Sequence, residues 1–168
     1  MKSHEKSILV ALDFSPCSER ALTVAVDLAS QLGAKLQVVH IFEPLTAFAP
    51  PLAAPLYTYA LDQLDEEQLR QRNQCIELCQ RVVDDRIPYT LHVFNGMAID
   101  GLLTAIGNLK PELVVIGSHG RGMFMQVLLG SVSTALCSRS PVPVVVVPPI
   151  EHAAPVTKET APASSAQL

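Results

Sequence analysis

The chain has 168 residues, of which 49% are hydrophobic and 17% are charged, a composition that fits one globular domain with a buried core. It has 12 Lys and Arg residues against 16 Asp and Glu residues, a formal net charge of −4, and no basic stripe. This charge balance excludes the electrostatic pattern of a nucleic-acid-binding protein, so we expect no nucleic acid partner.

The first two predicted strands are nearly continuous apolar runs, a pattern typical of strands covered on both faces. They span residues 7–13 and 35–42. Between them, Ser15 and Pro16 are typical of an N-cap and a first helical residue, and Gly33 is typical of a helix end. We therefore predict a strand, a helix and a second strand in this part of the chain.

The alternation of strands and helices continues after an insertion. Residues 44–61 are rich in Pro and Ala, and their prolines argue against a membrane-spanning helix. A long amphipathic helix is predicted over 62–86, and its inner face is predicted to hold Leu64, Ile76, Cys79 and Val83. The later predicted elements are strands over 89–94, 113–116 and 143–147 and helices over 98–109 and 131–138, followed by a flexible tail over 150–168.

These elements predict an α/β fold, a five-stranded and mostly parallel open sheet with helices on both faces. We expect the flavodoxin-like strand order 3-2-1-4-5, in a single domain over residues 1–149. In this order strands one and four flank the point at which the strand order reverses, where such sheets bind ligands. Those strands end at Asp13 and Gly117, so we expect the two residues to meet in one crevice.

A glycine-rich connection follows the fourth predicted strand, with the spacing Gly117-x2-Gly120-x9-Gly130-Ser131. Glycines let the backbone approach an anion closely, and the first turn of the next helix presents N–H groups to it. The connection is no P-loop, because Met123 stands where lysine is required, and it contains no G-x-G-x-x-G sequence. It therefore predicts a phosphate site of a third kind, with a tight turn before an ordinary capped helix as the alternative.

The chain resembles the universal stress protein family over about residues 5–149. The resemblance rests on five segments, which read ILVALDFS (8–15), HI (40–41), VVIGSHGRG (114–122), LGSVS (129–133) and PVPVVVVP (141–148). The G-x2-G-x9-G-[ST] signature is complete, and in this family it is the pattern associated with members that bind ATP. The resemblance thus implies an ATP site, and the clustered charge of a triphosphate favours Mg²⁺ as its companion.

The resemblance also implies a role for each site residue. Asp13 accepts hydrogen bonds from the ribose or adenosine part, Ile41 meets the edge of adenine through its main chain, and Ala11 packs near the base. The other implied contacts are Gly117 against the ribose, the N–H groups of Gly120, Gly130, Ser131 and Val132 on the phosphates, and a hydroxyl from Ser133. One departure is alanine at position 11, where some ATP-binding members have proline.

Three residues and one cysteine pair have a second interpretation. Asp13 alternatively caps the helix that follows Ser15, and Arg121 either meets a terminal phosphate or is a solvated loop arginine. His40, at a strand end, is interpreted as a satisfied, half-buried histidine rather than as a ligand. Cys75 and Cys79 are one helical turn apart, but no histidine pair accompanies them, which favours core packing over a metal site.

The predicted function is that of a nucleotide-dependent regulatory protein of the stress response, with no catalytic residues and at most weak ATPase activity. We expect a homodimer formed through strand 143–147, and the alternative function is an interaction module that needs no nucleotide and acts through this dimer surface and the insertion. Residues 48–59 form a lid, a partner-docking surface or a segment that packs on its neighbours. We expect a cytoplasmic protein with reduced thiols, a regulatory protein as partner and no membrane association.

Overall fold

The computed structural model describes residues 5–43, 54–120 and 129–149. Within these residues, five strands form one sheet in the order β3-β2-β1-β4-β5, and every neighbouring pair is parallel. The predicted α/β class and strand order are therefore confirmed. The strands are β1 (Ser7–Leu12), β2 (Lys35–Phe42), β3 (Tyr89–Asn95), β4 (Leu113–Gly117) and β5 (Val144–Val147), and the helices are α1 (Pro16–Leu32), α2 (Ala54–Val82), α3 (Ala98–Leu109) and α4 (Ser131–Arg139).

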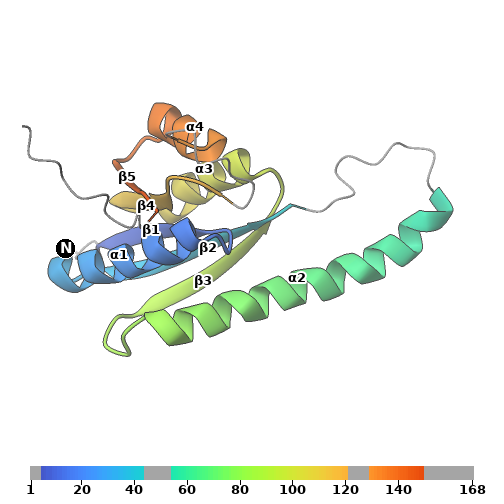
Figure 1. Cartoon of the computed structure of the whole chain (residues 1–168), viewed down its shortest axis with the longest axis horizontal. Coiled ribbons are helices and arrows are strands. Elements are labelled where there is room, and N and C mark those ends of the chain that lie inside the picture. The colour runs from blue at the N-terminus through green and yellow to red at the C-terminus, as the bar shows by residue number, and fades with distance from the viewer. Residues whose placement is uncertain (1–4, 44–53, 121–128, 150–168) are drawn as a thin grey trace, which may run out of the picture.

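Helices cover both faces of the sheet, α1 and α2 on one side and α3 and α4 on the other (Figure 1). The side chains of β1 alternate between two core clusters: Ile8 and Val10 face α1 and α2, and Leu9 faces α3 and α4. Every residue of β1 is buried, because this strand has a neighbour on each edge and a helical layer on each face. β1 is thus the central strand of the sheet.

Both predicted ends of α1 are confirmed. Ser15 is the N-cap, its hydroxyl accepts a hydrogen bond of 3.2 Å from the N–H of Ser18, and Pro16 takes the first helical position. Gly33 ends the helix in the left-handed conformation, with φ at 60°. The first turn of α1 lies close to the end of β4, where Gly117 faces the backbone of Cys17.

The predicted bounds of α2 are wrong at both ends, because the helix spans Ala54–Val82 rather than 62–86. It therefore takes in part of the predicted insertion. Pro55 is compatible with this start, since it is the second helical residue and its missing N–H has no intrahelical partner to lose. After Val82, the Asp84 carboxylate accepts hydrogen bonds of 2.9, 2.9 and 2.8 Å from the backbone N–H and the guanidinium of Arg86. This local turn replaces the last predicted turn of helix.

The inner face of α2 differs in part from its prediction. Among the residues of this helix whose side chains are described (from 64 on) and directly after it, Cys75, Leu78, Cys79 and Val83 are buried. They follow the i, i+3, i+4, i+8 spacing of one helical face, and Ile76 lies at the edge of that face. Ile76 and Leu64 are only half-buried, so the prediction was correct for Cys79 and Val83 alone.

Parts of the sequence prediction fall on residues that the structure does not describe. These are the insertion up to position 53, the tail over 150–168 and Arg121 with its two interpretations. Within the described ranges, no helix is long and apolar enough to cross a membrane.

Candidate functional site

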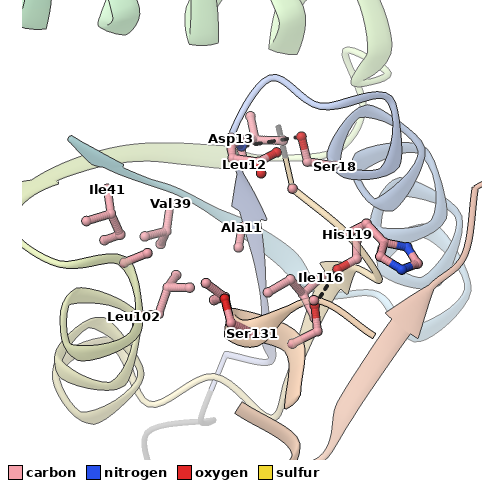
Figure 2. A pocket seen from close by; sticks show the side chains of 16 residues that line it. Ala11, Leu12, Asp13, Ser18, Val39, Ile41, Leu102, Ile116, His119 and Ser131 are labelled. Atoms are coloured by element: carbon pink, nitrogen blue, oxygen red, sulfur yellow. Dashed lines mark hydrogen bonds between the residues drawn. The ribbon is translucent and has the colours of Figure 1, made fainter. Parts of the chain in front are cut away.

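A cavity of about 290 Å³ lies at the carboxyl ends of β1 and β4, beside the helices α3 and α4 (Figure 2). The strand order reverses between β1 and β4, so the cavity is where a sheet of this kind accepts a ligand. All nine residues that the sequence singled out line it: Ala11, Asp13, Ile41, Gly117, Gly120, Gly130, Ser131, Val132 and Ser133.

Seven further residues of the lining were not among the predicted site residues. They are Leu12, Ser18, Val39, Ala98, Leu102, Ile116 and His119. Leu12, Ile116 and His119 adjoin predicted residues, so the bounds of the strands could have indicated them. Ala98 and Leu102 have no such signal, because only the packing of α3 over β2 brings them to the cavity.

One end of the cavity is apolar. Its walls are Ala11 of β1, Val39 and Ile41 of β2, and Leu102 of α3 (Figure 2). These four side chains belong to the core cluster between the sheet and the pair α3 and α4, so they are held in place by the core itself. This end can therefore take the faces of a planar ring by van der Waals contact.

The other end of the cavity is formed by the N-terminus of α4 and the loop that follows β4. Gly130 is the N-cap, and it has no side chain with which to cap the helix. The N–H groups of the first turn, at Ser131, Val132 and Ser133, have no intrahelical acceptors for geometric reasons. These donors and the positive end of the helix dipole make the N-terminus of α4 attractive to an anion.

Hydrogen bonds to β4 and its loop fix the start of α4. The Gly130 N–H donates to the carbonyl of Ser118 at 2.8 Å, so this donor already has a partner within the protein. The buried hydroxyl of Ser133 lies 2.8 Å from the carbonyl of Gly117 and 3.2 Å from that of Ser118. Both groups were expected from the sequence to face phosphate, whereas in the structure they bond to backbone carbonyls and position the loop.

Asp13 joins the β1–α1 turn to the same loop. Its Oδ1 accepts hydrogen bonds from the backbone N–H of Ser15 at 3.0 Å and from the Ser15 hydroxyl at 2.6 Å. That hydroxyl also lies 3.2 Å from the carbonyl of His119. The α1 cap is thus Ser15 and not Asp13, and Oδ2 of Asp13 lies on the side of Gly120, 2.8 Å from where a Cβ would be.

The three signature glycines differ in how much room a side chain would find at each position. A Cβ at Gly117 would lie 2.8 Å from the carbonyl carbon and the Cβ of Cys17, so this glycine lets α1 approach β4. At Gly120 the side-chain position is occupied by the carboxylate of Asp13. A Cβ at Gly130 would be 3.3 Å from the carbonyl oxygen of Ser118, which is tight but tolerable. Only Gly130 therefore has room for a side chain.

His40 is a satisfied core histidine, as its position at a strand end suggested, although it is fully buried rather than half-buried. Its Nδ1 lies 2.8 Å from the carbonyl of Leu12, and its Nε2 lies 2.8 Å from Oε1 of Gln71 on α2. The ring also contacts that of Phe14, with centroids 4.8 Å apart, and Phe14 has a positive φ of 63°. His40 thereby supports the turn that presents Asp13.

The two cysteines of α2 behave as core residues. Burial raises the pKa of the Cys75 thiol to about 12 and that of Cys79 to about 11. No group of three side chains that could hold a metal ion occurs among the described residues. The core-packing interpretation of the pair is supported by this burial.

Thiol reactivity tests the placement of the cysteines. Cys137 is exposed, whereas the other three thiols are buried. At about pH 8, an aromatic disulfide reagent should therefore modify one thiol rapidly in the native protein and all four in denaturant. The rapid phase should disappear in Cys137→Ser. A second rapid thiol in the native protein would contradict the burial described above.

Comparison with known proteins identifies the family. A family profile described as the universal stress protein family matches residues 5–148. A universal stress protein of Thermus aquaticus is 31% identical over 142 residues, which are 84% of this chain and 98% of the relative. One of Mycobacterium tuberculosis is 35% identical over 139 residues, 83% of this chain but only 44% of the relative, so this chain spans less than half of it.

Solved structures have the same fold. The universal stress protein UspA of Lactobacillus plantarum matches with a TM-score of 0.73 at 22% identity, over 87% of this chain and 99% of its own. A universal stress protein in complex with cAMP matches with a TM-score of 0.54 at 23% identity, over 86% of this chain and 98% of its own. A family protein of Arabidopsis thaliana with AMP bound matches with a TM-score of 0.54 at 15% identity, over 86% of this chain and 92% of its own. These structures share the fold, and the profile and the Thermus relative show that the chain belongs to the universal stress protein family.

Proposed function

We propose that this protein is a cytoplasmic, ATP-binding regulatory protein of the stress response, which hydrolyses ATP slowly or not at all. One observation supports this most strongly: nine residues, chosen from the sequence for a nucleotide, line a single cavity at the switch point of the sheet. All four cysteines are free, as is usual in a reducing compartment.

The apolar end of the cavity suits a nucleoside base. Its walls, among them Val39, Ile41 and Leu102, offer aliphatic surface to the faces of a ring. The volume of about 290 Å³ is at the lower end of the range of small-molecule pockets, about 300–1,000 Å³. A base at this end would bring the ribose to Asp13, whose Oδ2 is not engaged in the hydrogen bonds with Ser15.

The other end suits phosphate. Its described lining contains no lysine or arginine, so a triphosphate would depend on backbone donors at Ser131 and Val132 and on Mg²⁺. Bound Mg²⁺ would reduce the mutual repulsion of the phosphate oxygens. Two structural neighbours in the family bind cAMP and AMP, which favours an adenine nucleotide here.

We infer that hydrolysis is slow because the described lining supplies little for the transition state. Its titratable side chains are Asp13 and His119. One oxygen of Asp13 is held by Ser15, and the Nδ1 of His119 lies 2.8 Å from the hydroxyl of Ser118. Backbone donors bind a ground-state triphosphate well, whereas catalysis requires groups that act more strongly on the transition state.

The first test is to identify the nucleotide that the freshly purified protein contains. We expect mass spectrometry of the denatured extract to detect an adenine nucleotide, and calorimetry of the emptied protein to detect binding of Mg·ATP. The ratio of ATP to ADP during incubation then measures hydrolysis. An empty protein that also fails to bind added Mg·ATP would refute the proposal.

A second candidate is a dimeric interaction module that works without nucleotide. β5 is an edge strand, and Val144, Val145 and Val146 in it are only partly buried. Pairing with β5 of a second copy would cover these valines and both edges. Sedimentation of the nucleotide-free protein measures whether it is a dimer. A stable dimer that also still binds its partner without nucleotide would favour the module.

A further inference from the structure

Two glycines lie inside α3, where glycine destabilises a helix relative to alanine. They are Gly101 and Gly107, and neither has a positive φ. Neither is the cap of the helix, since α3 continues to Leu109, eight residues beyond Gly101 and two beyond Gly107, and its C-cap is Lys110. Their surroundings, however, differ.

Gly101 makes room for a side chain from the sheet. A Cβ built on it would lie 2.9 Å from Cδ1, 3.0 Å from Cγ2 and 3.3 Å from Cγ1 of Ile41. A Cβ on Gly107 would meet nothing within 4 Å. The space that a methyl group would take at position 101 is therefore occupied by the side chain of Ile41. The corresponding space at position 107 is empty in the described structure.

Ile41 is at the same time a wall of the cavity. It is 8% exposed and stands opposite Leu102, the neighbour of Gly101 in α3 (Figure 2). We propose that Gly101 is a positioning residue of the nucleotide site: by letting Ile41 lie against α3, it keeps the apolar end of the cavity wide enough for a purine base. The ligand in this inference rests on the proposed function, whereas the position of Ile41 does not.

The backbones of β2 and α3 are both held in place, so a Cβ at position 101 would displace the side chain of Ile41. β2 pairs with β3 through Ile41 itself and with β1 up to His40, so neighbouring strands hold its backbone at this end. α3 is anchored in the core by Ala105 and Ile106, which are almost fully buried. The side chain of Ile41 must therefore rotate, and the open space that it borders is the cavity.

The test uses Gly101→Ala with Gly107→Ala as its matched control. Both variants exchange the same residues in the same helix, but only the first should narrow the cavity. We expect Gly101→Ala to weaken the binding of ATP about tenfold in calorimetry, and Gly107→Ala to leave it unchanged. In Gly101→Ala/Ile41→Ala, which lacks all three Ile41 atoms that crowd the new Cβ, affinity should return to within about twofold of Ile41→Ala alone.

A measurement without nucleotide tests the position of Ile41 by itself. In methyl NMR of the ligand-free protein, the ¹³C shift of the Ile41 δ1 methyl reports its rotamer. We expect this shift to change in Gly101→Ala and to stay constant in Gly107→Ala. If Gly101→Ala does not fold, Ile41→Ala should restore folding in the double variant.

The outcomes separate the two claims. Wild-type protein that does not bind ATP refutes the proposed function, and the methyl shift then decides the position of Ile41. Wild-type protein that binds ATP, together with unchanged affinity and an unchanged methyl shift in Gly101→Ala, overturns the role of Gly101. Failure of Ile41→Ala to restore affinity or folding overturns it as well.

Discussion

Gly130→Asp should lower the affinity for ATP roughly 100-fold or more while the protein stays folded. Gly130 is the N-cap of α4 with φ at −68° and ψ at 163°, a conformation that aspartate adopts readily. An aspartate there would accept the N–H groups of the first turn and place a negative charge at the helix N-terminus. The first effect occupies the N–H donors that phosphate would need, and the second repels its negative charge. The new cap at the same time stabilises α4.

Gly107→Asp is the matched control for this experiment, because it makes the same change of charge at an exposed position with open space around it. Gly130→Asn adds a cap of similar size without the charge and should lose less affinity. Calorimetry with Mg·ATP measures all three variants, and circular dichroism monitors their folding. Wild-type affinity in Gly130→Asp would mean that phosphate does not lie at the N-terminus of α4.

Gly117→Ala, at another glycine of the same signature, should act on stability instead. The new Cβ would lie 2.8 Å from the backbone of Cys17 and 2.9 Å from the nitrogen of Ser18, and backbone atoms cannot rotate away. We therefore expect the free energy of unfolding to fall by about 2–3 kcal/mol. Urea unfolding measures the loss. Gly107→Ala provides the reference, since it should gain up to about 1 kcal/mol. Unchanged stability in Gly117→Ala would contradict the close approach of α1 to β4.

Local patterns were sufficient for most of the fold. Ser15, Pro16 and Gly33 mark the ends of α1 by their own chemistry, and the structure places both ends there. The start of α2 was missed for an equally local reason. Pro55 counted against a helix in the sequence, although a proline in the first turn breaks no intrahelical hydrogen bond.

The candidate site was predictable where a motif marks it and not elsewhere. Gly120, Gly130 and Ser131 belong to a signature with fixed spacing, and they line the cavity. Ala98 and Leu102 line it too, but they have the residue types of any buried helix face. Contacts between distant segments were likewise invisible, such as the approach of Gly117 to Cys17, which gives this glycine a packing role besides any contact with ligand.

The cavity takes its walls from β1, α1, β2, α3, β4 and α4, so it forms only when these elements are folded together. Whatever binds there binds the native state alone and makes every global opening rarer. A ligand at a hundred times its dissociation constant adds about 2.7 kcal/mol to the free energy of unfolding. Proteases act mainly on opened molecules, so the cellular lifetime of this protein would rise and fall with the concentration of its ligand. The amount of this protein would then depend on the concentration of its ligand in the cell.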